Sequence, residues 1–480
     1  MFLIQRRLFR ASLLFALCIS AAEPPVAWKP ALDRISARSL RGHLSFLASD
    51  LLEGRATPSR GLDLAAEYIA SQFRRAGLDP AGDDGYFQTA KMVELTPNAE
   101  GFDITLHHGE ETIAIPRKNA VPHLARALAL SDVQLFRAAG ANADALARDQ
   151  VRGRVVVLDS TRAARRMQSA LQKMEPAAII RLVSDDAPPV PLAQLVEAGG
   201  EPHGAPVILV SDPDAARVLR DLKPGLSDWK VSMRIAAERA TPVTVRNVIG
   251  VLRGSDPVLK DTYVMLTAHY DHLPPGDAGA DRIYNGANDN GSGTVSVIEI
   301  GAALASLPQH PRRTVVFMAV FGEEEGLLGS LYYVRHPVFP LEKTVADVNL
   351  EQVGRTDSSE GPRLATATFT GFAYSDIPEA FRKAGEEVGV KLYELPHGGD
   401  EYFNRSDNLS FAQHGIPAHT AVVAAEYPDY HAVGDEWPKI DYENMAKVDR
   451  MLALGMLMIA DNPQAPKWNQ DKAGRYAHAR

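Results

Sequence analysis

Residues Thr267–Thr294, TAHYDHLPPGDAGADRIYNGANDNGSGT, decide how this chain folds. They follow the apolar, β-forming run TYVML and lead into an apolar pattern of helical period, TVSVIEIGAALASL. A strand that passes through a glycine-rich loop into a helix is typical of an open α/β sheet, and such sheets place their sites at the carboxyl ends of the strands. We therefore expect His269, Asp271 and Asp289 to lie at a functional site on that edge.

A second stretch of this kind is Gly322–Ser330, GEEEGLLGS, which directly follows the apolar run Thr314–Phe321. Buried carboxylates without partners are very costly, so a hydrophobic strand that runs into three glutamates indicates a metal ion. Adjacent carboxylates at a strand end can divide the work, because one can bind the metal while the other acts as general base for a bound water. Glu323 and Glu324 are the candidates for these two roles.

Other interpretations of these motifs exist. An H-x-D pair such as His269 and Asp271 is, on its own, typical of a surface loop. The run around Asp289 is similar to a calcium-binding loop, but the terminal glutamate and the regular spacing of acids are missing, which leaves calcium as the minor alternative. The chain shows no HExxH, GxSxG, Walker or dinucleotide-binding motif, which removes the common rival enzyme classes.

The N-terminus has the pattern of a secretory signal. Three arginines precede the apolar run ASLLFALCIS, and small residues precede Glu23. We expect residues 1–22 to be removed and the protein to be exported to the periplasm or the extracellular space. The only cysteine, Cys18, lies in this segment, so a metal site in the mature chain uses His, Asp and Glu.

Composition limits the class of protein. The chain has 480 residues, is 45% hydrophobic and carries a formal net charge of −9. This length favours two domains, the acidity provides no basic footprint for nucleic acid, and no apolar run after the signal is long enough to span a membrane.

The block from about residue 90 to 239 has a different texture, because short β-like runs alternate there with Ala-rich helices and Pro-rich turns. It contains no cluster of histidines and acids, which indicates a separate, non-catalytic module. The predicted organisation is a signal peptide at 1–22, a catalytic domain in two parts at 23–109 and 237–462, an inserted domain at 110–236, and a poorly ordered tail at 463–480.

Taken together, the motifs resemble those of the co-catalytic zinc exopeptidases, which include bacterial leucyl aminopeptidases and glutamate carboxypeptidase. The order is AHYDH, GANDNGSG, GEEEGLLGS, VNLEQVG, RSDN and YHAVGDEW. The resemblance implies an α/β fold with a central, mostly parallel sheet flanked by helices. The inserted block resembles a smaller α/β protease-associated domain.

The resemblance also implies two zinc ions and their ligands, which are His269, Asp289, Glu324, Glu351 and His431. Asp289 would bridge the two ions, Glu323 would be the general base, and Asp271 would support His269. Glu351 stands where the family usually has aspartate, and its side chain is one methylene longer.

The implied activity is the hydrolysis of peptides by metal-activated water. The acidic cluster suits a cationic N-terminus, which favours an aminopeptidase. A carboxypeptidase of the same family stays open because Arg355 and Arg405 lie near the motifs, and so does a single-zinc enzyme similar to glutaminyl cyclase. A binding protein that has lost catalysis is disfavoured because all five ligand positions hold metal-binding residue types. Tyr402 or Tyr430 is the candidate for stabilising the oxyanion.

Overall fold

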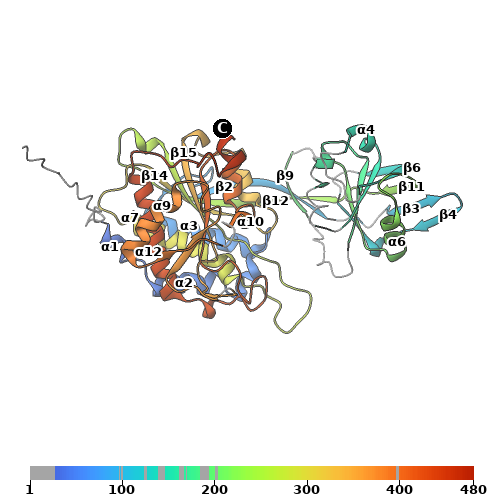
Figure 1. Cartoon of the computed structure of the whole chain (residues 1–480). Helices are drawn as coiled ribbons and strands as arrows, with labels where there is room; N and C mark the ends of the chain where they lie inside the picture. The colour runs from blue at the N-terminus through green and yellow to red at the C-terminus, as the bar shows by residue number, and fades with distance from the viewer. Residues whose placement is uncertain are drawn as a thin grey trace, which may run out of the picture.

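The computed structural model describes residues 28–479, apart from gaps at 97, 99–100, 124–126, 139–145, 160, 162–166, 169, 184–193, 200–203, 360 and 396–398. The predicted signal peptide at 1–22 lies outside the described residues. Two lobes, each built on its own sheet, are joined by a long two-stranded ribbon (Figure 1).

The larger sheet has ten strands in the described part of the chain, of which β1 (Asp79–Pro80) lies off the main path and pairs with β12. The order of the others is β19 (Lys391–Leu392), β18 (Thr366–Phe369), β20 (Ala418–Val422), β15 (Thr344–Glu351), β13 (Tyr263–His269), β14 (Thr314–Val320), β12 (Arg239–Leu252), β2 (Phe87–Thr96) and β9 (Gln194–Glu197).

The centre of this sheet is parallel, and both flanks contain antiparallel pairs, with β18 antiparallel to β20 on one side. Strands β20, β15, β13 and β14 run parallel to one another, whereas β12, β2 and β9 pair antiparallel. The predicted α/β class is confirmed. The sheet is mixed rather than mostly parallel, because the chain leaves along β2 and returns beside it along β12.

Layers of side chains cover both faces of the central strands. Every residue of β13 is buried, and the side chains alternate between the two faces. Val264 and Leu266 belong to the core under the helices, while Tyr263 and Met265 belong to a second core on the opposite face. This is why such strands appear in the sequence as continuous apolar runs.

Helices on the first face include α2 (Ala37–Leu47), α3 (Arg60–Ala76), α7 (Gly293–Ala305), α9 (Ile377–Val388) and α12 (Tyr442–Asp461). The second face carries α8 (Leu328–Arg335) and α11 (Asn408–Ala412). The helix α3 shows how local signals set these bounds. The Ser59 hydroxyl accepts a hydrogen bond from the Leu62 N–H at its start, and Gly77 ends it at φ +79°.

The C-terminal residues are packed against the second face, so the prediction of a poorly ordered tail at 463–480 is wrong for the described residues up to 479. Trp468 and Tyr476 are buried in the second core. The indole N–H of Trp468 donates a hydrogen bond to the Gly415 carbonyl at 3.0 Å. Two large aromatic side chains bury enough apolar surface to order this otherwise polar segment.

The smaller lobe is built on a second sheet, which lies at the right in Figure 1. Its order is β4 (Glu111–Ala114), β3 (Asp103–His108), β11 (Gly225–Ile235), β6 (Leu128–Arg137), β7 (Val155–Leu158), β8 (Ala178–Leu182), β10 (Val207–Val210) and β5 (Ala120–His123). Helices α4 (Arg148–Val151) and α6 (Pro213–Asp221) lie in the same lobe. Its apolar residues form clusters of their own.

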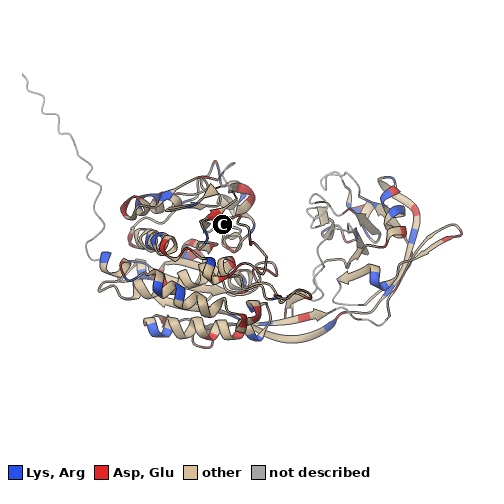
Figure 2. Ribbon diagram, turned by 90° about the horizontal axis from the view of Figure 1, so that it is seen from below, with Lys and Arg blue, Asp and Glu red and all other residues tan. Residues whose placement is uncertain are grey.

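The ribbon between the lobes consists of β2 and β12, which Figure 2 shows running side by side from one lobe to the other. Their pairing extends from Phe87 opposite Val248 to Thr96 opposite Arg239. One segment returns from the block to the larger sheet, because β9 pairs with β2 as an edge strand. The domain limits at 110 and 236, and the likeness to a protease-associated domain, stay predictions.

Among the described residues, none of the helices combines the length and the apolar character that crossing a membrane requires.

Candidate metal centre

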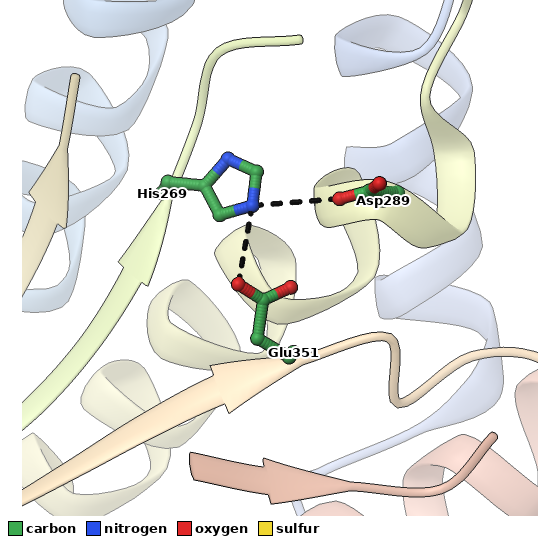
Figure 3. Close-up of side chains that lie close together, drawn as sticks. All are labelled: His269, Asp289 and Glu351. Atoms are coloured by element: carbon green, nitrogen blue, oxygen red, sulfur yellow. Dashed lines mark ion pairs between the residues drawn. The ribbon is translucent and has the colours of Figure 1, made fainter. Parts of the chain in front are cut away.

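Three of the predicted residues meet at the carboxyl edge of the larger sheet (Figure 3). His269 ends β13, Glu351 ends β15, and Asp289 lies in the short helical turn Ala287–Ser292 ahead of α7. The Nε2 atom of His269 lies 3.4 Å from Oδ1 of Asp289 and 3.3 Å from Oε1 of Glu351. All three side chains are buried, so one imidazole nitrogen and two carboxylates converge in the interior.

Glu324 and His431 face the other side of Asp289. Strands β13 and β14 are parallel neighbours, with His269 opposite Val320, which brings the segments that follow them together. Nε2 of His431 lies 3.1 Å from Oδ2 of Asp289 and 3.4 Å from Oε2 of Glu324. Asp289 therefore presents one carboxylate oxygen to His269 and the other to His431.

His272, which the sequence-based prediction missed, lies on the same side. Its Nδ1 atom lies 2.8 Å from Oε1 of Glu324, and its side chain is buried. Ligand atoms of His272, Asp289 and Glu324 all lie within 4.8 Å of one another, as do those of His269, Asp289 and Glu351. The signal that could have found it is the second histidine of AHYDH, which lies in the same short segment after the strand.

These residues fit bound zinc. Histidine nitrogens and carboxylate oxygens are the ligands that zinc takes where cysteine is absent. The Nε2 atoms of His269 and His272 are buried and have no hydrogen-bond partner among the described residues. A buried polar atom without a partner costs roughly 1–3 kcal/mol, and a metal ion bound by Nε2 of His269 would remove that cost at His269.

Asp271 holds the ring of His269. Nδ1 of His269 forms a hydrogen bond with the Asp271 backbone carbonyl at 3.2 Å and lies 3.3 Å from Oδ1 of the Asp271 carboxylate. That carboxylate also accepts hydrogen bonds from the Thr57 hydroxyl at 3.1 Å and the Glu323 N–H at 3.2 Å. Histidines that bind a metal commonly donate their other nitrogen to a carboxylate, which fixes the ring orientation. The arrangement leaves Nε2 of His269 directed at Asp289 and Glu351.

Ser406 holds the side chain of Glu351 in place, as Asp271 holds the ring of His269. The Ser406 hydroxyl donates a hydrogen bond to Oε1 of Glu351 at 2.6 Å, and the side-chain amide of Asn349 donates to the Ser406 oxygen at 2.7 Å. The extra methylene of Glu351 thus brings its carboxylate within reach of Ser406 while the same oxygen still faces His269.

The environment separates the two neighbouring glutamates. Burial raises the pKa of Glu323 well above its ordinary value, and the nearby carboxylates of Glu351 and Glu324 raise it further. Burial also acts to raise the pKa of Glu324, but hydrogen bonds from His272 and His431 outweigh it and lower that pKa to about 2. Adjacent acids whose pKa values are pushed apart typically have different roles. Glu324 is held as a charged carboxylate by its two histidine partners, and Glu323 lines the cavity.

A cavity of about 80 Å³ opens beside these residues. Its acidic end is formed by Asp289, Glu323 and Glu351, and apolar side chains in its wall are Leu395, Val422 and Ala425. This volume and lining suit a single small or medium apolar side chain placed next to the candidate metal ligands.

Arg355 and Arg405, which kept a carboxypeptidase as an alternative function, have different surroundings. Arg355 is buried and paired with Asp357 at 2.6 Å and Asp429 at 2.9 Å, so it is committed to structure. Arg405 is exposed, lines the cavity and lies over the Tyr402 ring at 5.5 Å.

Of the two tyrosines proposed for the oxyanion, Tyr402 donates its hydroxyl to Glu426 at 2.9 Å. Tyr430 stacks on the His431 ring, with ring centroids 4.1 Å apart. Both line the cavity. The engaged hydroxyl of Tyr402 makes Tyr430 the better candidate.

Arg55, far away in the sequence, fixes the loops that carry the site. Its buried guanidinium donates hydrogen bonds to the carbonyl oxygens of Tyr270 at 2.9 Å, Asn285 at 2.7 Å and Gly286 at 3.0 Å. Burial lowers its pKa to about 10, although nearby acids, Asp271 first among them, act to raise it. No local pattern announces this role, because every partner is a backbone carbonyl.

Comparison with known proteins found relatives whose names state an activity. Residues 247–456 match the family model described as Peptidase family M28. Aminopeptidase YwaD of Bacillus subtilis (strain 168) is 29% identical over 233 residues, which cover 47% of this chain and 47% of that protein. A probable zinc metalloprotease of Pyrenophora tritici-repentis is 34% identical over 281 residues, covering 48% of this chain and 55% of that protein. The chain thus spans about half the length of the curated relatives it matches.

Two solved structures share the fold. An aminopeptidase from Aneurinibacillus sp. strain AM-1 is 17% identical with a TM-score of 0.59, covering 91% of this chain and 96% of the other. The zinc aminopeptidase BSAP from Bacillus subtilis is 21% identical with a TM-score of 0.53, covering 88% and 94%.

The resemblance inferred from the order of motifs is confirmed by these findings. Every one of the motifs that carry it, from AHYDH to YHAVGDEW, lies inside the matched segment. Residues 247–456 of this chain match the model of Peptidase family M28, and this match is the resemblance that the order of motifs implied.

Proposed function

We propose that this protein is an aminopeptidase that uses two zinc ions to release N-terminal residues from peptides. The observation that carries the proposal is the sharing of Asp289, whose two oxygens face His269 and His431 at 3.4 and 3.1 Å. A carboxylate placed between two sets of ligands is the usual bridge of a two-metal site. The proposed ligands are His269 and Glu351 on one side and Glu324 and His431 on the other.

The chemistry that zinc supplies when bound is a coordinated water of lowered pKa and a polarised scissile carbonyl. The protein's own side chains do the rest. Glu323 accepts the proton of the attacking water and passes it to the leaving amine. Asp271 and Ser406 keep His269 and Glu351 in place, and Tyr430 donates a hydrogen bond to the developing oxyanion.

The lining of the cavity favours an aminopeptidase over a carboxypeptidase. Its lining includes the carboxylates of Asp289, Glu323 and Glu351, which suit the ammonium group of a peptide N-terminus. A carboxypeptidase needs a free cation to bind the carboxylate of its substrate. Arg355 is committed to Asp357 and Asp429, and Arg405, which lines the cavity, lies over the ring of Tyr402. The apolar wall at Leu395 and Val422 is the proposed pocket for the side chain of the first residue.

The test combines a metal count with a substrate panel. Zinc per chain is measured by mass spectrometry on the purified protein, and hydrolysis is followed with aminoacyl anilides and their N-acetylated counterparts. We expect two zinc ions and hydrolysis that requires the free amine. Equal cleavage of acetylated substrates would contradict an aminopeptidase, and a single zinc with cyclisation of N-terminal glutamine would favour the cyclase-like alternative.

Export stays part of the proposal. N-terminal sequencing of the protein recovered from outside the cytoplasm should begin at Glu23, after the predicted signal. Recovery of the uncleaved chain from the cytoplasm alone would contradict it.

A further inference from the structure

His272 is a buried histidine at the candidate metal centre that the mechanism above does not use. Its ring lies in van der Waals contact with the loop that leads to Asp289. A Cβ added at Gly286 would come within 2.5 Å of the Cγ and Cδ2 atoms of His272, so this glycine makes room for the ring. The backbone at Gly286 is itself held by Arg55. The position of the imidazole is therefore set by packing.

The contact of His272 with Glu324 is directional. Nδ1 of His272 lies 2.8 Å from Oε1 of Glu324, whereas Nε2 of His431 lies 3.4 Å from Oε2. The two carboxylate oxygens are thus divided between two histidines. An Nδ1 that donates its proton to a carboxylate has no lone pair left for a metal ion.

We propose that His272 is a positioning residue that orients Glu324 for zinc. Its Nδ1–H holds Oε1, which turns Oε2 toward Asp289 and His431. Carboxylates that bind a metal are themselves commonly held by hydrogen bonds. His272 then holds the carboxylate of Glu324 by a hydrogen bond, in the same way that the Ser406 hydroxyl holds the carboxylate of Glu351. The inference rests on the proposed zinc site but not on peptidase activity.

Three substitutions distinguish a positioning role from direct zinc ligation by His272 and from no role in zinc binding. In His272→Asn the amide nitrogen occupies roughly the place of Nδ1 and can still donate to Glu324. In His272→Gln it occupies roughly the place of Nε2, and His272→Ala removes both. The affinity of the weaker zinc site is measured by competition with a chromophoric chelator, without substrate, and circular dichroism checks the fold of each variant.

We expect the zinc affinity of one site to fall about 10–100-fold in His272→Ala and His272→Gln and to stay close to the natural value in His272→Asn. His43→Ala, which removes a buried histidine paired with Glu299 away from the site, should leave zinc affinity unchanged. Unchanged zinc affinity in His272→Ala would show that His272 has no part in zinc binding and would overturn the proposal. Retention in His272→Gln with loss in His272→Asn would show a ligand acting through Nε2, and equal loss in all three would also reject positioning.

Because zinc binding is measured without substrate, the outcome stands apart from the proposed activity. A protein that binds two zinc ions and passes this test, yet cleaves no aminoacyl anilide, would refute the aminopeptidase and leave the role of His272 intact.

Discussion

At the scale of single residues, Glu323 and Glu324 are neighbours in sequence with opposite electrostatic surroundings. Glu324 receives hydrogen bonds from two histidines, while the Glu323 side chain faces the cavity with other carboxylates near it. A carboxylate held by two histidines is prepared to remain a charged ligand, and a carboxylate that lines the cavity is placed to exchange a proton with what binds there. The division of roles predicted from sequence stays a prediction, and mutation tests it directly.

We expect Glu323→Gln to lower kcat by about 10²–10⁴, because it removes the proposed general base. Zinc per chain and the thermal unfolding temperature should change little. Glu325→Gln, at the next glutamate in the chain, is the matched control and should keep most of the activity. If zinc were lost in step with activity in Glu323→Gln, the assignment of base and ligand would have to be exchanged.

Glu351 is the residue at which this chain departs from the family pattern. Its Oε1 both accepts the Ser406 hydrogen bond and lies 3.3 Å from Nε2 of His269. We expect Glu351→Ala to lose one zinc ion on limited dialysis against a chelator and Glu351→Asp to keep both, since a carboxylate remains. Mass spectrometry gives the count. Two zinc ions retained in Glu351→Ala would remove Glu351 from the ligand set.

His269, Asp289 and Glu324 could be proposed from the sequence because each follows an apolar strand or lies in a glycine-rich turn, whereas Glu351 and His431 entered the set only through the resemblance. The residues that hold these ligands in place could not be proposed from the sequence. Ser406 and Asn349 meet Glu351 from separate segments, and Arg55 reaches its backbone partners across more than 200 residues of chain. His272 was hidden for another reason, because one histidine in AHYDH already explained the motif.

At the scale of elements, β20 carries a histidine that makes stability depend on pH. His419 is fully buried, with Nε2 2.6 Å from the Ser375 hydroxyl and Nδ1 2.9 Å from the Thr370 carbonyl. Burial lowers its pKa to about 4, against an ordinary value of 6.5. The imidazole is therefore neutral in the folded protein over a range in which the unfolded chain binds a proton.

The direction in which the free energy of unfolding changes with pH follows from the difference in bound protons between the two states. As pH falls from 6.5 to 4, the unfolded state gains a proton that the folded state does not, so the free energy of unfolding decreases. The full effect is about 3 kcal/mol. His419→Asn, which keeps a donor for the Thr370 carbonyl, should show a smaller loss of stability across this range in chemical denaturation. A substitution at His310, whose side chain is only partly buried, is the control. Parallel pH profiles for His419→Asn and the natural protein would contradict this account.

The elements also show where sequence patterns fail. The central strands are buried on both faces, and their unbroken apolar runs predict them well. Strand β9 has no such signal, because it joins the larger sheet from within the block predicted to be separate. The C-terminal segment looked like a tail by composition, and only tertiary packing of Trp468 and Tyr476 orders it.

At the scale of the whole molecule, the candidate site lies in one lobe. Every proposed ligand lies on or after β13, in the part of the chain that follows the return of β12. The smaller lobe has apolar clusters of its own. We propose that the two lobes are separate domains, with the smaller one acting on the choice of substrate.

Replacing residues 97–238 by Asn-Gly should leave a folded catalytic core. Thr96 and Arg239 are paired opposite each other, so a two-residue turn can connect β2 and β12 directly. We expect unchanged zinc per chain, retained cleavage of small anilides and an altered preference among peptides. The deletion also removes β9 and exposes the edge of β2, so a second version carries Val93→Lys to discourage aggregation. A folded product that binds no zinc would show that the smaller lobe contributes to the site.

The smaller sheet is formed by the segment of chain that connects β2 to β12 of the larger sheet, and this connectivity affects the order of folding. In an unfolded chain, bringing Thr96 to Arg239 closes a long loop, and the entropy cost grows with the logarithm of loop length. The second sheet pairs Asp103 with Arg234, so once it has formed, the remaining free chain between β2 and β12 is short. The saving is about 2 kcal/mol. The loop cost is then met by the contacts of the second sheet, so β2 and β12 pair more readily after the smaller lobe has folded than before it.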